Sequence, residues 1–143
     1  MKRLFILILA LLTALMMASC KKAEEPAEPE ADTDSGYRRT TLYYATEDGF
    51  IVPVMKSIPW EEGIGRAALS YLVSGIDNDK SAAMMGLKTV IPEGTECTLR
   101  IGEGGSARVD LTDIGQQTKE QEHAMVVAIV DTLTEFPSIN NVS

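Results

Sequence analysis

The sequence predicts a small α+β domain in which a mixed or antiparallel sheet carries two helices on one face. Three observations lead to this class. Two neighbouring runs are rich in β-branched and aromatic residues, two later runs alternate apolar with polar residues, and two segments place apolar residues at helical spacing. The expected order is ββαββα, followed by a short terminal strand.

Residues 1–19 are predicted to be a signal peptide. Lys2 and Arg3 precede an apolar run that is short for a membrane span and typical of a secretory signal. The sequence Met17-Ala18-Ser19-Cys20 resembles the lipobox of bacterial lipoproteins, in which cleavage precedes the cysteine and its sulfur takes a diacylglyceryl group. We therefore expect lipidation (a palmitate-type anchor) at Cys20 and a location on the extracytoplasmic face of the cell membrane. An uncleaved membrane anchor is the alternative.

Residues 20–36 are predicted to form the lipidated cysteine and a disordered linker. The segment after Cys20 holds six acidic residues and two prolines, with no Leu, Ile, Val or aromatic residue. Such a segment buries nothing and is kept extended by charge repulsion and proline. The domain itself is expected to span residues 37–143.

The first two strands form a predicted hairpin. Thr40–Thr46 is β-branched and aromatic, Asp48-Gly49 supplies a turn, and Phe50–Lys56 forms the second strand. Because Pro53 cannot donate a ladder hydrogen bond, we expect its strand at a sheet edge or at a bulge.

The first helix is predicted to begin at Pro59 and to end at Gly75. Its apolar stripe consists of Ile64, Ala67, Ala68, Tyr71 and Leu72. The following segment, Ile76–Gly86, is predicted to be a loop with at most one helical turn.

A second hairpin is predicted from Thr95–Ile101 and Ser106–Leu111, which a short loop joins. The loop length and the alternation together fix the register. The expected cross-strand partners are Ile101 with Ala107, Leu99 with Val109, and Cys97 with Leu111. This register also opposes Arg100 to Arg108, a repulsion that Asp110 could soften.

The second helix is predicted to begin at a capping box, Thr118–Gln121, and to end at Pro137. Its expected apolar stripe consists of Val126, Ile129, Val130 and Leu133, widened by Met125 and Phe136. Ile139–Val142 is expected to begin a final strand.

Five stretches of the chain resemble a known family when they are taken together and in order. They are Leu42–Val54, Arg66–Gly75, Gly86–Thr95, Ala107–Thr112 and Ala128–Ile139. Residues 37–143 resemble the GerMN domain of the GerM family of sporulation and spore-germination lipoproteins. The resemblance implies a fold similar to ring-building-motif domains and a non-enzymatic role in envelope assembly. The founding member carries the domain twice, whereas this chain carries it once. The family pattern also continues into a longer last strand, so the resemblance implies either that the final strand is truncated at Ser143 or that the chain is a fragment.

The composition excludes several classes of function. The chain has 143 residues and a formal charge of −8, so it lacks the basic surface that nucleic acid binding needs. Two cysteines and one histidine are too few for a structural zinc site. Aromatic residues make up only 6% of the chain, which disfavours a stacking platform for sugars. We expect no cofactor and no metal.

No catalytic constellation is predicted. Cys97 is read as a small inward-facing hydrophobe rather than a nucleophile or an intermolecular disulfide partner, and His123 as a surface residue. Asp110, Asp113 and Asp131 could form a carboxylate set for glycan cleavage, but surface roles explain them more simply.

Four residues are candidates for contact with a protein partner: Trp60, Tyr43, Tyr44 and Pro53. Trp60 is either a core residue at the start of the first helix, which we favour, or a partly exposed anchor for a partner. Strand alternation buries one of Tyr43 and Tyr44 and exposes the other. Pro53 indicates an exposed backbone edge that could accept an added strand.

The leading hypothesis is therefore a membrane-anchored, non-enzymatic interaction module. Its expected partners are the membrane through the lipid anchor, other envelope or sporulation-channel proteins, and further copies of itself. A peptidoglycan-binding module and an enzyme acting on the cell wall are the alternatives.

Overall fold

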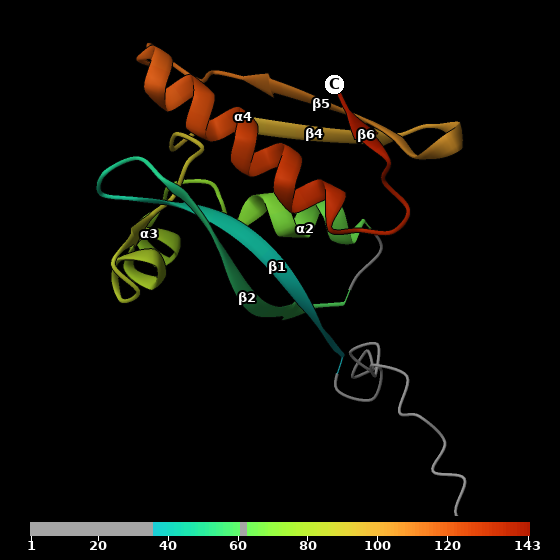
Figure 1. The fold of residues 1–143 in the computed structure, drawn as a ribbon, viewed down its shortest axis with the longest axis horizontal. Coiled ribbons are helices and arrows are strands. Elements are labelled where there is room, and N and C mark those ends of the chain that lie inside the picture. The colour runs from blue at the N-terminus through green and yellow to red at the C-terminus, as the bar shows by residue number, and fades with distance from the viewer. Residues whose placement is uncertain (1–35, 61–62) are drawn as a thin grey trace, which may run out of the picture. The chain divides into compact units, whose positions relative to one another are not determined.

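A computed structural model describes residues 36–60 and 63–143. Within these ranges the chain forms three α-helices and two three-stranded sheets (Figure 1). The predicted α+β class is confirmed. Three details differ from the prediction: the strands divide between two sheets, a third helix is present, and Leu87–Lys88 forms an additional short strand. The predicted signal peptide and all but the last residue of the predicted linker lie outside the described residues.

The first sheet has the order β2-β1-β3, and its strands are β1 (Tyr37–Thr46), β2 (Ile51–Pro59) and β3 (Leu87–Lys88). Both pairings are antiparallel. Gly49, with a φ of 83°, makes the predicted turn, and its N–H donates to the carbonyl of Thr46 at 3.0 Å. β2 lies at the edge, as Pro53 indicated.

The first helix, α2 (Ile64–Ser70), is shorter than predicted. Pro59 ends β2 instead of starting the helix, and Gly75 precedes the next helix instead of ending this one. The chain leaves the helix early because the carbonyl of Leu72 accepts hydrogen bonds from the N–H groups of Val90 and Ile91. These bonds draw the segment after α2 away from the helical path and beside the segment after β3.

The segment predicted to be a loop forms helix α3 (Ile76–Ala83). Side chains hold it in place: Asp79 accepts a hydrogen bond from the N–H of Gly75, and the Asn78 amide donates to the carbonyls of Ser70 and Val73. α3 buries Ala82 alone and leaves Ile76 87% exposed. It therefore lacks the apolar stripe by which a helix is recognised in a sequence.

The second sheet has the order β4-β5-β6, and its strands are β4 (Glu96–Ile101), β5 (Ser106–Thr112) and β6 (Asn141–Val142). A short 3₁₀ turn, η2 (Glu103–Gly105), joins the antiparallel strands β4 and β5. Every predicted cross-strand partner is confirmed. β6 pairs in parallel with the start of β5.

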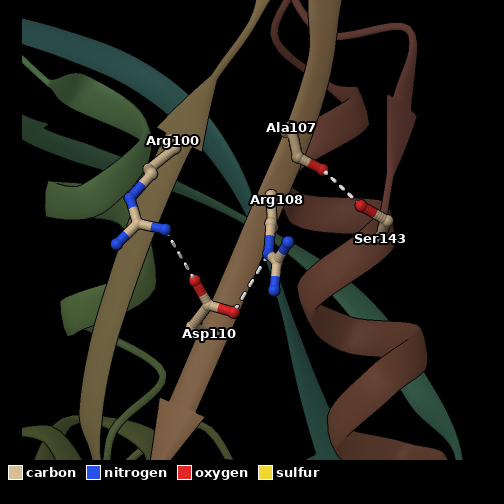
Figure 2. A network of polar contacts seen from close by, with 5 residues as sticks. All are labelled: Arg100, Ala107, Arg108, Asp110 and Ser143. Atoms are coloured by element: carbon tan, nitrogen blue, oxygen red, sulfur yellow. Dashed lines mark hydrogen bonds and ion pairs between the residues drawn. The ribbon is translucent and has the colours of Figure 1, made fainter.

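The register opposes Arg100 to Arg108, and Asp110 compensates for it as predicted. Its carboxylate accepts from Arg100 Nη1 at 3.3 Å and from Arg108 Nε at 3.2 Å (Figure 2). The same view shows the hydroxyl of Ser143 beside the carbonyl of Ala107, where the chain following β6 runs along β5.

The last helix, α4 (Lys119–Thr134), begins with the predicted capping box, in which Thr118 and Gln121 each accept from the other's backbone N–H. Its buried stripe consists of Met125, Ala128, Ile129, Thr132 and Leu133. The predicted stripe was therefore wrong in part, since Val126 is 55% exposed and Val130 is only half-buried. Phe136 is buried, as expected.

Helices α2 and α4 lie between the two sheets (Figure 1). α4 contacts β1, β2 and β6, while α2 contacts β4, β2 and α4. One hydrophobic core results, and its fully buried side chains come from both sheets and both helices: Leu42, Tyr44, Ile58, Leu69, Leu72, Ala107 and Leu133. None of the described helices is long and apolar enough to cross a membrane.

Candidate interaction surface

The residues considered for catalysis lie on β4, on β5 and the segment after it, and on α4. Cys97 is half-buried in β4, and burial raises the pKa of its thiol. His123 is exposed on α4, Asp110 is held by two arginines, Asp113 is exposed after β5, and Asp131 is half-buried on α4. Among residues 36–60 and 63–143, no group of three His, Cys, Asp or Glu side chains is placed to hold a metal ion.

A cavity of about 410 Å³ lies between the β1 turn, β3 and the start of α4. Its lining is mixed in polarity and includes Thr46, Thr89, Gln117 and Gln121. Glu47 also lines it, and Lys88 Nζ lies 2.8 Å from the Glu47 carboxylate. The lining offers several hydrogen-bonding groups, and the hydroxyl of Thr89 donates to the Asp79 carboxylate.

The outward side chains of β1 and β2 form a continuous surface that we call the hairpin face. It consists of Tyr37, Arg39, Thr41 and Tyr43 from β1 and of Pro53, Met55, Ser57 and Pro59 from β2. Tyr37 is 52% exposed and Met55 is 60% exposed. Tyr43 and Pro53 are direct cross-strand partners. Tyr44 points into the core instead, so it is excluded as a partner contact in the folded domain.

Tyr43 ties the hairpin face to α4. Its hydroxyl donates to the Glu135 carboxylate at 2.8 Å, and its backbone N–H donates to Thr132 Oγ1 at 3.1 Å. The hydrogen bond to Glu135 is the main cause that raises the pKa of Tyr43. α4 therefore lies along the edge of β1 that faces away from β2. The open edge of the sheet lies along β2.

The backbone pattern shows why Pro53 is tolerated at that edge. Trp60 N–H donates to the carbonyl of Gly36 at one end of the hairpin, and Thr46 N–H donates to the carbonyl of Phe50 at the other. Hydrogen-bonded pairs recur every second residue in an antiparallel ladder, so the odd-numbered residues of β2 turn their backbone groups outward. Pro53 and Pro59 are two of these, and neither has an N–H. The edge is thus poorly suited to strand addition, and the face is the better docking surface.

Trp60 is 59% exposed at the end of the hairpin, so the core position that we favoured is wrong. β2 continues to Pro59 and delivers Trp60 to the surface, whereas Phe136 supplies the buried ring nearby. The Arg38 guanidinium lies 5.2 Å from the centre of the Trp60 ring and 5.8 Å from that of Phe136. A cation placed there attracts the face of the exposed ring.

Sequence reasoning missed Met55 as a surface residue. Its spacing of two residues from Pro53 was a usable signal, because alternate residues of a strand share one face. The predicted second strand ended at Lys56, which left the second half of the face unrecognised.

Known structures identify this architecture as a GerMN domain. The first GerMN domain of the sporulation protein GerM from Bacillus subtilis superposes with a TM-score of 0.66 at 30% identity, covering 73% of this chain and 78% of that one. The tandem GerMN domains of the same protein give a TM-score of 0.65 at 28% identity over 74% of this chain and 38% of that one.

The family follows from the sequence match. The model of the Germane family, described as sporulation and spore germination, matches residues 41–143, and the chain belongs to this family. The spore germination protein GerM of Bacillus subtilis (strain 168) is 29% identical over 122 residues, which cover 85% of this chain. The match spans only 33% of that relative's length.

Proposed function

We propose that this chain is a lipid-anchored, extracytoplasmic module without enzymatic activity that binds envelope proteins during sporulation or germination. Membership of the sporulation and spore germination family supports the process. The predicted lipobox at Cys20 supports the anchor, and the acidic linker supports a tethered domain. The proposed partners are other envelope or sporulation-channel proteins and further copies of this chain.

The observation that carries the proposal is the apolar content of the hairpin face. Met55 is a large side chain that is 60% exposed on one face of the hairpin, near the exposed Pro53. A residue of this kind, with polar neighbours such as its cross-strand partner Thr41 and the nearby Ser57, is typical of the centre of a protein interface.

Capture of partners from sporulating cells tests the interaction. The full chain, purified from membranes, is expected to retain a reproducible set of envelope proteins. Met55→Asp should weaken that capture by about tenfold or more, because it removes an exposed apolar side chain and places a charge in the interface. Ile76→Asp is the matched control, since Ile76 is 87% exposed on α3, away from the hairpin face. Equal capture by both variants would refute the role of the hairpin face.

The anchor is tested separately. Mass spectrometry of the membrane-bound chain should show a diacylglyceryl group at Cys20, and Cys20→Ser should yield an unprocessed precursor or a released protein. A cleaved Cys20→Ser chain that remains on the membrane would contradict lipid anchoring.

Co-sedimentation with purified peptidoglycan, unaffected by Met55→Asp, would favour a wall-binding module instead.

A further inference from the structure

At one end of the β1–β2 hairpin, β1 begins and β2 ends. Exposed aromatic rings and arginines lie together at this end. We call it the hairpin end, and it consists of Tyr37, Arg38, Arg39 and Trp60. Tyr37 and Trp60 are each more than half exposed. Trp60 makes two contacts with the start of β1: its N–H donates to the carbonyl of Gly36 at 2.8 Å, and Arg38 lies over its ring.

The order of the chain links this end to the predicted anchor. Tyr37 follows Cys20 by 17 residues, and a chain of that length spans at most about 60 Å when fully extended. The other end of the hairpin, at Phe50, lies about 30 Å further along the strands at ~3.3 Å per residue. The hairpin end is therefore the part of the domain that follows Cys20 most closely along the chain.

The chemistry of the hairpin end suits the headgroup region of a bilayer. Trp and Tyr rings prefer this region because it accommodates an apolar ring with a polar edge. Guanidinium groups bind phosphate oxygens with two parallel hydrogen bonds. Among the described residues, the ion pairs engage Lys88, Arg100 and Arg108, and no carboxylate pairs with Arg38 or Arg39.

We propose that the hairpin end docks in the lipid headgroup region and so orients the domain with the rest of the hairpin directed away from the membrane. The proposal rests on the lipid anchor proposed above. Two glutamates, Glu61 and Glu62, follow Trp60, so the contact depends on the rings more than on net positive charge. The tether raises the local concentration of membrane to the millimolar range, which makes a weak contact sufficient.

Trp60 reports directly on this contact, because it is the only tryptophan in the chain. The full chain, lipidated at Cys20, is reconstituted into phosphatidylcholine vesicles that carry bromine atoms near the headgroup. Docking predicts a blue shift of the Trp60 emission and loss of most of its intensity to bromine quenching. A soluble quencher such as acrylamide should lose most of its effect when vesicles replace detergent.

A matched variant moves the reporter to the other end of the hairpin. In the double variant Trp60→Phe with Phe50→Trp, the new tryptophan replaces a ring that is 69% exposed in the β1–β2 turn. This reporter should keep its intensity in brominated vesicles and stay accessible to acrylamide. Equal quenching of both reporters would overturn the proposed orientation.

Mass spectrometry of the same sample distinguishes a failure of the proposed lipid anchor from a failure of the proposed headgroup contact. If Cys20 carries no lipid, the proposed anchor and this inference both fail. If Cys20 is lipidated and Trp60 is not quenched, the inference alone fails. Acrylamide protection that appears only after envelope proteins are added would overturn it as well and would assign the hairpin end to a protein partner.

Discussion

Gly105 is a residue whose missing side chain allows two segments to meet. It has a φ of +73°, and an added Cβ would lie 2.7 Å from the Ser138 carbonyl and 2.6 Å from the Asn140 side chain. Gly105→Ala should therefore destabilise the domain twice, by about 1–2 kcal/mol for the left-handed backbone and by about 1–3 kcal/mol for the overlap. Urea denaturation gives the free energy of unfolding that tests this.

Gly104 is the natural control, because its φ is +71° and a Cβ there would meet nothing within 4 Å. Gly104→Ala should show the backbone cost alone. Equal losses of stability in the two variants would mean that the contact with Ser138 and Asn140 does not constrain the fold.

Tyr44 makes the stability of the domain sensitive to alkaline pH. The side chain is 1% exposed, and burial raises the pKa of Tyr44 from 10 to about 12. Below pH 10 the phenol is protonated in both the folded and the unfolded states, so its contribution to stability is fully present. Between pH 10 and 12 the unfolded chain loses this proton first, and the free energy of unfolding should fall by about 2–3 kcal/mol.

Urea denaturation across this pH range, repeated on Tyr44→Phe, isolates the effect. The variant should lose most of the alkaline slope and retain the part that comes from Tyr43, whose pKa is also raised. An unchanged slope in Tyr44→Phe would assign the alkaline sensitivity to other groups.

At the scale of elements, a hydrogen bond between α4 and β1 decides how the helix lies on the sheet. Thr132 is fully buried, and its Oγ1 accepts from the N–H of Tyr43. Thr132→Val would leave that N–H without a partner and should cost about 1–3 kcal/mol. Thermal and urea unfolding measure the loss.

Thr40 gives the opposite expectation for the same substitution. It is 6% exposed in β1, and its hydroxyl has no hydrogen-bond partner among the described residues. Thr40→Val should therefore be neutral or stabilising. A loss of stability as large as that of Thr132→Val would show that the cost comes from the change of shape rather than from the hydrogen bond.

The β4–β5 hairpin was predictable in full because local rules determine it. Alternation places Cys97, Leu99 and Ile101 on one face, and the loop length then allows only one register that keeps their partners on that face. The same holds for the start of α4, where the capping box involves only residues within one turn.

Elements that depend on distant contacts were not predictable in this way. Thr132 faces inward on α4, where it accepts a hydrogen bond from the N–H of Tyr43, 89 residues away in the sequence. A pattern of hydrophobic residues does not detect this polar contact, so it places the buried stripe of α4 too far toward Val126. α3 is held by Asn78 and by capping at Gly75, and neither gives a periodic signal.

At the scale of the molecule, the candidate surface depends on where strands end. The sequence indicated Pro53 and Tyr43, which share the hairpin face, and it left two positions open for Trp60. The length of β2 determines that Trp60 is exposed. β2 continues for three residues beyond the predicted end at Lys56, and these residues carry the chain past the core before Trp60. A strand boundary is a property of the assembled sheet, and local propensity fixes it poorly.

Both sheets should unfold as one unit, because α2 and α4 join them through a shared core. Leu133 on α4 is fully buried and lies close to Gly65 of α2, where Leu99 of β4 also packs. Leu133→Ala should cost about 2–5 kcal/mol. Native-state hydrogen exchange should show the same loss of protection for slow amides of β1 and of β5. Val126→Ala on the exposed side of α4 should change stability by less than about 0.5 kcal/mol. Loss of protection confined to the amides of one sheet would instead show two units that unfold independently.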